Sequence, residues 1–208
     1  MNDLNKKLIL SFLIVFFLGT VALFTLREAT ESKIQNLNVV SSVPSFELVN
    51  FNEKIFTDNN LLDKITILSF VFTSCPDACP IMSENFSILQ ERFKDSDLIQ
   101  FVSITVDPDY DSNDILKTFS EKYSNGNNWY FLRGDKNYIS TLSEKGFFLS
   151  ALNLPAGHST SFVLIDKQKN IRKYYKGTDD AAIMELQNDI VFLTVSYTHL
   201  TLPTNREV

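Results

Sequence analysis

The strongest constraint on folding lies in residues 65–106, where two apolar runs flank a helical pattern. Ile65–Phe72 (ITILSFVF) and Leu98–Val106 (LIQFVSITV) contain no charged residue and several β-branched ones, which is typical of strands covered on both faces. Between these runs, apolar residues recur at near-helical spacing from Ile81 to Phe93. The sequence therefore predicts parallel strands joined by a helix.

The rest of the chain continues this alternation of strands and helices. The further predicted elements are a hairpin at 46–49 and 54–56, a helix at 115–123, a strand at 129–132, a short helix at 138–142, hairpin strands at 161–165 and 171–175, and a last amphipathic helix at 183–193. Candidate caps for the helix at 115–123 are Asp111, Ser112 and Asn113. The predicted class is α/β, a mixed sheet with flanking helices, in the order of a thioredoxin-like fold with an N-terminal β-hairpin.

The N-terminal segment predicts one transmembrane helix. Leu8–Leu26 contains no charged residue and, as a helix, spans about 28 Å, close to the thickness of a hydrocarbon core. Because Lys6 and Lys7 precede it, we expect the N-terminus in the cytoplasm and everything after Arg27 outside it. The alternative is a cleaved signal peptide, although the apolar stretch is long for one and no A-x-A site follows. The expected location is the inner membrane, single-pass, with the C-terminal domain on the periplasmic side.

The composition limits the function classes. A hydrophobic fraction of 44% and a charged fraction of 21% indicate a chain that folds. A net charge of -6, without a basic stripe, argues against a nucleic-acid partner. Two cysteines are too few for a disulfide-dense scaffold or for a four-cysteine zinc or iron–sulfur site.

Both cysteines lie in one segment, Phe72–Pro80 (FTSCPDACP), which leaves a predicted buried strand and enters a helix. Such a loop lies at the carboxyl end of the sheet, where sites of α/β proteins form. The unpaired N–H groups and the dipole of the helix stabilise a thiolate there. Cys75 and Cys79 can therefore form a disulfide or bind one soft metal ion, and a purely structural disulfide is the alternative. Their three intervening residues differ from the two of thioredoxin-type redox centres.

His158 is the candidate third ligand. It precedes the predicted strand at 161–165, whose start faces the cysteines in a thioredoxin-like fold. Soft thiolates favour Cu(I), and an added imidazole makes Cu(II) acceptable, whereas structural zinc normally has four protein ligands. Asp107, at the end of the strand 98–106, is a candidate for orienting His158 or a thiol, or else a turn residue before Pro108.

At this point the chain resembles the Sco/SenC family of copper chaperones, over about residues 44–193. The resemblance rests on CPDACP (75–80), TVDPDYD (105–111), WYFL (129–132) and GHSTSFVLID (157–166). It implies a membrane-anchored thioredoxin-like domain that helps to mature the copper A centre of cytochrome c oxidase, with Cys75, Cys79 and His158 as the copper ligands. Two positions depart from the family: Gly157, where an acidic residue is usual, and Tyr110, where arginine is usual.

The predicted organisation has five parts. They are a cytoplasmic N-terminus at 1–7, an anchor at 8–26, a tether at 27–43, a thioredoxin-like copper-binding domain at 44–194 and an atypical tail at 195–208. The tail (VSYTHLTLPTNREV) resembles the peptide translated from sequencing-adapter DNA and is expected to be an artefact without function. A genuine unstructured extension is the alternative.

Two functions from different classes remain open. The first is copper carriage without turnover, with the copper A subunit of the oxidase as partner. The second is thiol–disulfide exchange by Cys75 and Cys79, which reduces the cysteines of an oxidase subunit. Other copper carriers or thiol reductants are further expected partners. The copper function requires His158, whereas the exchange reaction does not. A peroxiredoxin fits less well, because peroxiredoxins have a Thr-x-x-Cys arrangement with a proline before the threonine. Here SFVF (69–72) precedes Thr73, and that proline is missing.

Overall fold

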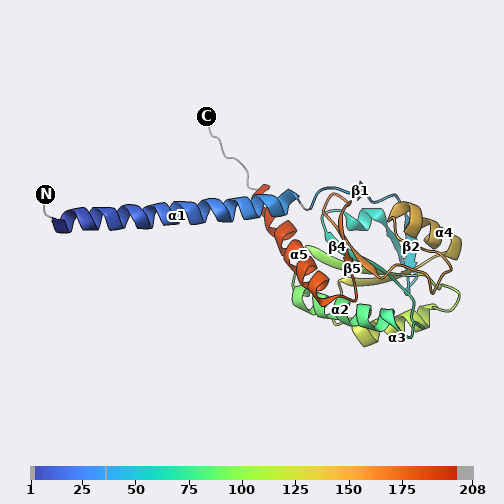
Figure 1. Cartoon of the computed structure of the whole chain (residues 1–208). Helices are drawn as coiled ribbons and strands as arrows, with labels where there is room; N and C mark the ends of the chain where they lie inside the picture. Colours follow the sequence, from blue (N-terminus) through green and yellow to red (C-terminus); the bar gives the residue numbers. More distant parts are fainter. Residues whose placement is uncertain (1–2, 36, 201–208) are drawn as a thin grey trace. The chain divides into compact units, whose positions relative to one another are not determined.

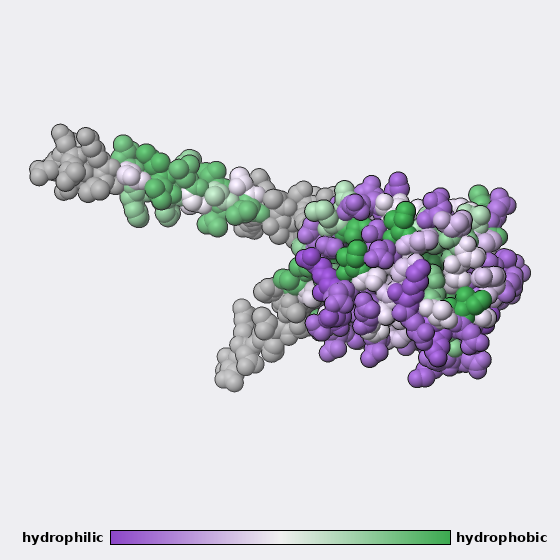
Figure 2. Space-filling model, turned by 90° about the horizontal axis from the view of Figure 1, so that it is seen from below, coloured by the Kyte–Doolittle hydropathy of each residue, from purple (hydrophilic) through white to green (hydrophobic). Residues whose placement is uncertain are grey.

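The computed structural model describes residues 3–35 and 37–200, with side chains over 9–26 and 37–195, and divides into two compact units, Met1–Asn38 and Val39–Val208. In the first unit, α1 (Asp3–Gln35) contains one stretch, Ile9–Leu26, that is long and apolar enough to cross a membrane. Its apolar side chains are exposed, as the green surface of α1 in Figure 2 shows. A signal sequence near the N-terminus would pass the same test.

Helix α1 continues into the predicted tether, residues 27–43, as far as Gln35. Arg, Glu, Ala, Lys and Gln dominate this segment (REATESKIQ), and these residues favour helix. Extending a helix that has already formed is also easier than starting one.

The second unit is built on an eight-stranded mixed sheet with the order β1-β8-β7-β4-β5-β6-β2-β3. The strands are β1 (Ser41–Ser42), β2 (Glu47–Asn50), β3 (Ile55–Thr57), β4 (Ile65–Val71), β5 (Ile99–Thr105), β6 (Trp129–Arg133), β7 (Ser161–Ile165) and β8 (Asn170–Lys176). The neighbours β4, β5 and β6 are parallel, and the other pairs are antiparallel. The predicted mixed sheet and its N-terminal hairpin, β2–β3, are confirmed.

Helices cover both faces of this sheet. They are the 3-10 helix η1 (Asp58–Leu61), α2 (Ala78–Phe93), α3 (Asn113–Tyr123), α4 (Lys136–Thr141), the π-helical turn η2 (Leu142–Gly146) and α5 (Asp180–Leu200). Figure 1 shows α2 and α3 on one side of the sheet and α4 on the other. Helix α5 continues beyond the predicted end near residue 193, so the expected tail is helical as far as Leu200. The remainder of that tail, 201–208, lies outside the described residues.

Aromatic packing fixes β4 from both faces. On one face Phe86 of α2 packs against Phe101 of β5, with ring centroids 5.3 Å apart, and against Phe162 of β7, at 4.6 Å. On the other face Phe70 of β4 packs edge-to-face against Phe147, at 5.7 Å. Every residue of β4 is buried. The carboxyl end of β4, from which the cysteines follow, is therefore held in a rigid core.

Candidate metal centre

The cysteine loop, residues 72–77, connects the carboxyl end of β4 to the first turn of α2. Cys75 is half-buried before the helix, and Cys79 is buried in its first turn. The backbone N–H of Cys79 donates to Sγ of Cys75 over 3.4 Å. A helix leaves its first N–H groups without partners inside the helix, and here the sulfur of Cys75 accepts one of them. Pro80 lies in this first turn, where its missing N–H removes no hydrogen bond.

His158 approaches Cys79 from the segment that precedes β7. Its Nδ1 lies 2.9 Å from the carbonyl oxygen of Ser159, and its Nε2 lies 3.3 Å from Sγ of Cys79. Because a carbonyl can only accept, Nδ1 carries the proton and the lone pair of Nε2 faces the sulfur. The ring also packs edge-to-face against Phe72, with centroids 5.4 Å apart. The imidazole is therefore oriented as a metal ligand would be.

The thiolate that the helix start was expected to stabilise is not found at Cys79, because burial keeps both partners of this contact neutral. Burial raises the pKa of the Cys79 thiol to about 12, an effect to which the side chain of Cys75 and the charge of Asp111 add, while the backbone of Phe72 opposes it. Burial lowers the pKa of His158, and the hydrogen bond to the Ser159 carbonyl only partly offsets this. At neutral pH a neutral thiol thus faces a neutral imidazole, and its S–H donates to Nε2.

The three predicted ligands lie together but do not converge on one point. Both cysteines are free thiols. In the part of the chain that the structure describes, no three His, Cys, Asp or Glu side chains are arranged to hold a metal ion as they stand. Cys79 and His158 are in contact, whereas the sulfur of Cys75 accepts a hydrogen bond from the backbone N–H of Cys79. Two thiols and an imidazole remain a donor set that suits copper.

Asp107 lies after β5, and its described contacts are with Lys136, Thr105, Tyr110 and Asp111, not with His158 or a cysteine. Its carboxylate is 3.9 Å from Nζ of Lys136, and its N–H donates to Oγ1 of Thr105 over 3.0 Å. The hydrogen bond that orients His158 is made by Ser159 instead. A role of Asp107 at the ligands therefore stays a prediction.

Asp111 is the residue at this site that sequence reasoning missed. It was a candidate helix cap, but the cap of α3 is Ser112, whose Oγ accepts from the N–H of Ile115 over 3.4 Å. Asp111 is instead fully buried, and it accepts hydrogen bonds from Thr73 in the cysteine loop. The sequence signals were its place after β5, at the same edge of the sheet as the cysteines, and its membership of the TVDPDYD segment (105–111) in the family resemblance.

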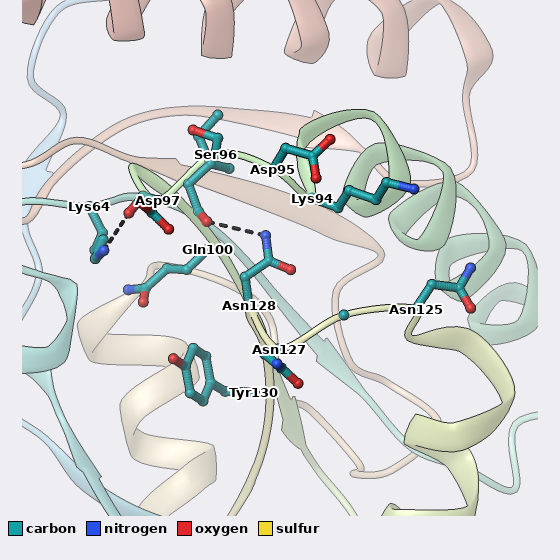
Figure 3. A pocket seen from close by; sticks show the side chains of 12 residues that line it. Lys64, Lys94, Asp95, Ser96, Asp97, Gln100, Asn125, Asn127, Asn128 and Tyr130 are labelled. Atoms are coloured by element: carbon teal, nitrogen blue, oxygen red, sulfur yellow. Dashed lines mark hydrogen bonds between the residues drawn. The ribbon is translucent and has the colours of Figure 1, made fainter.

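A polar cavity of about 490 Å³ lies at the opposite edge of the sheet (Figure 3). Its walls come from the segments that precede β4, β5 and β6 and from the first residues of β5 and β6, and the amides of Asn125, Asn127 and Asn128 are prominent among them. Asn128 uses one of its N–H groups internally, donating to the carbonyl of Ile99 over 3.3 Å. No cysteine or histidine is among its lining residues, so this cavity offers no soft ligand for copper.

The fold and the site define a thioredoxin-like domain with two cysteines at the start of a helix and a histidine opposite them. The model of the SCO1/SenC family matches residues 35–190. The chain therefore belongs to the SCO1/SenC family, which confirms the resemblance found in the sequence. An SCO2-like protein of Rickettsia typhi is 30% identical over 156 residues, which cover 70% of this chain and 76% of that protein.

Solved structures agree with this assignment. One similar structure is that of BsSco, a member of the Sco family of cytochrome c oxidase assembly proteins in which a disulfide switch was identified. It matches this chain with a TM-score of 0.68 and 25% identity. The match covers 76% of this chain and 96% of BsSco. ScoI of Arabidopsis thaliana with copper bound has a TM-score of 0.64 over 76% of this chain and all of that one. At 23% identity, this second similarity concerns the fold alone.

Proposed function

We propose that this protein is a membrane-anchored copper chaperone that binds copper through Cys75, Cys79 and His158 and delivers it to the copper A centre of cytochrome c oxidase. The observation that carries the proposal is the 3.3 Å approach of His158 Nε2 to Cys79 Sγ, beside the thiol of Cys75. The similarity to BsSco, a member of the Sco family of cytochrome c oxidase assembly proteins, supports it.

Copper is the cargo of this reaction, and each ligand has a role in carrying it. The two soft thiolates hold Cu(I), and the neutral imidazole adds a ligand that Cu(II) also accepts. Binding has to displace the proton of Cys79, whose thiol is neutral before copper arrives. Three protein ligands leave a coordination position through which a receiving protein can take the ion.

A second candidate function is the reduction of cysteines in an oxidase subunit. The pairing of a half-buried Cys75 with a buried Cys79 favours it. In this reaction the thiolate of Cys75 attacks the partner's disulfide, and Cys79 then displaces the partner from the mixed disulfide. The partner leaves with two thiols, and this chain is left with a Cys75–Cys79 disulfide.

Copper titration of the reduced full chain tests the proposal. The wild-type protein is expected to bind one copper ion, and Cys75→Ala or Cys79→Ala to abolish tight binding. His158→Ala should weaken Cu(II) binding most, while binding of Cu(I) survives on the two thiolates. In cells, the copper function requires oxidase assembly to fail in His158→Ala and to recover partly with added copper. Normal assembly in His158→Ala, together with failure of both Cys variants, would instead identify a thiol reductant.

We also propose that α1 is an uncleaved anchor and that the domain lies on the periplasmic side of the inner membrane. The support is the apolar stretch Ile9–Leu26 and the two lysines before it, Lys6 and Lys7. In that compartment a disulfide between the two cysteines is chemically permitted.

A further inference from the structure

Asp111 is a fully buried carboxylate that the proposed copper ligands do not include. It accepts hydrogen bonds from the backbone N–H of Thr73, at 3.3 Å and 3.2 Å from its two oxygens. It also accepts from the hydroxyls of Thr73 and Thr105. Hydrogen bonds to a carboxylate in a buried site are among the stronger ones in proteins, so the side chain of Asp111 connects Thr73 and Thr105 firmly.

These contacts join two structural elements at the edge where the copper site lies. Thr105 is the last residue of β5 and pairs with Val71, the last residue of β4. Thr73 lies beyond that pair, in the cysteine loop and two residues before Cys75. Asp111 therefore extends the connection between β4 and β5 past the end of their ladder and into the cysteine loop.

Thr73 lies next to the residue that connects the cysteines with the histidine. The ring of Phe72 packs edge-to-face against His158, and the carbonyl of Phe72 accepts the N–H of Cys75 over 3.4 Å. Thr73 is covalently bonded to Phe72. Fixing the backbone of Thr73 therefore limits how far Phe72 can move relative to His158 and to Cys75. The position of the cysteine loop relative to His158 thus depends on the carboxylate of Asp111.

We infer that Asp111 is a positioning residue of the copper site, which holds Thr73 so that the cysteine loop and His158 keep the spacing that one copper ion requires. The inference rests on the proposed copper function and deepens it. A role in the fold alone would lower stability but would leave the spectroscopic signature of bound copper unchanged.

The test compares three single variants of the full chain and the double variant Asp111→Asn/Thr73→Val. Asp111→Asn keeps the size of the side chain but leaves one acceptor oxygen, and Thr73→Val removes only the hydroxyl that donates to Asp111. Thr105→Val is the comparison on the side of β5: it removes one hydroxyl donor to the carboxylate and the acceptor of the Asp107 N–H, but leaves the hydrogen bonds between Asp111 and Thr73 in place. Each variant is loaded with one equivalent of Cu(II), and its affinity, electron paramagnetic resonance spectrum and melting temperature are measured.

We expect Asp111→Asn and Thr73→Val to weaken Cu(II) binding about tenfold and to change the copper spectrum. The double variant should add little to the larger single effect, because both changes break one connection. Thr105→Val should lower the melting temperature and leave the spectrum unchanged. The inference is overturned if Asp111→Asn and Thr73→Val lower stability but retain the wild-type affinity and spectrum.

A measurement without metal separates this inference from the proposed function. The rate at which a thiol reagent modifies buried Cys79 in the reduced, copper-free chain should rise in Asp111→Asn and Thr73→Val, and not in Thr105→Val. If the wild-type chain binds no copper, the proposed function fails. A faster modification of Cys79 would then still support positioning of the loop by Asp111, and an unchanged rate would overturn it.

Discussion

The site depends on how closely the backbone around His158 is packed. A Cβ atom placed on Gly157 would lie 1.6 Å from the carbonyl oxygen of Leu152, well inside the distance at which two atoms repel. Only glycine allows this close approach of backbone to backbone. The acidic residue that is usual before the histidine in the family would meet the same obstruction. Gly157 therefore belongs to the geometry that brings His158 to Cys79.

Gly157→Ala should displace the segment 152–158 and separate His158 from Cys79. We expect a loss of about 1–3 kcal/mol in the free energy of unfolding, typical of overpacking, and a weaker affinity for Cu(II). Chemical denaturation and copper titration measure the two effects. Gly126→Ala is the matched control, because its Cβ would lie 3.3 Å from the end of the Gln90 side chain, at the far edge of the sheet. Unchanged Cu(II) binding in Gly157→Ala would contradict this account.

How much of the site the sequence predicts depends on the kind of contact. Cys75, Cys79 and His158 follow from residue type and from their place at strand ends. The cysteines follow the carboxyl end of β4, and His158 precedes β7, which runs antiparallel to β4 and therefore begins at the same edge of the sheet. The hydrogen bond from His158 to Ser159 involves a backbone carbonyl, which no sequence pattern marks. Asp111 looks like one of several helix caps, and its burial against Thr73 is a tertiary contact. Their roles could therefore be read only from the structure.

At the scale of elements, a partly buried ion pair joins η1, which follows the N-terminal hairpin, to the opposite part of the sheet. Nζ of Lys169, in the turn between β7 and β8, lies 2.6 Å from Oδ2 of Asp58 in η1. The hydroxyl of Ser45 also donates to this carboxylate, over 3.1 Å. Burial by itself raises the pKa of Asp58, but these partners outweigh it, so that the pKa lies below its usual value of 3.8.

The pair predicts how stability responds to acid. Because the pKa of Asp58 is lower in the folded state, its contribution is fully present above pH 3.8 and is lost as the pH falls through the folded-state value. Asp58→Asn should lower the free energy of unfolding by about 1–3 kcal/mol at pH 7 and reduce the loss of stability in acid. Denaturant titrations from pH 7 down to about pH 3 measure both effects. A variant with the acid sensitivity of the wild type would refute this role.

The elements differ in how far the sequence predicts them. The strands β4 and β5 and the helices α2 and α3 follow from hydrophobic periodicity, because each buries one face or both. Strand β1 was not predicted, since Ser41–Ser42 has no apolar pattern and is ordered by pairing with Ile171 and Asn170 of β8. The predicted end of helix α5 near residue 193 was also too early, because a helix that has already formed extends at little cost in free energy.

At the scale of the whole molecule, an apolar helix and a thiol-bearing domain are joined in one chain. The helix contains the membrane-length stretch Ile9–Leu26, and the domain carries both cysteines. The proposed arrangement places the thiols where a disulfide is permitted and copper can be passed to a membrane-bound oxidase.

A reporter enzyme fused after Leu193 should be active only outside the cytoplasm, because Lys6 and Lys7 retain the N-terminus inside. The matched control exchanges both lysines for glutamine, which should reduce the bias in orientation. A signal from the cytoplasmic side in the wild-type fusion would overturn the proposed location. Cleavage of the purified protein near Arg27 would preserve the compartment but remove the anchor.

The coordination of bound copper tests the central claim most directly. X-ray absorption at the copper edge, recorded on the full chain loaded with one equivalent of Cu(II), should show sulfur neighbours from two cysteines and a nitrogen neighbour from imidazole. His158→Ala should lose the imidazole signal and keep the sulfur, and any copper that still binds weakly to Cys75→Ala should show fewer sulfur neighbours. A wild-type spectrum with only oxygen and nitrogen neighbours, or one that His158→Ala leaves unchanged, would contradict a copper site made by Cys75, Cys79 and His158.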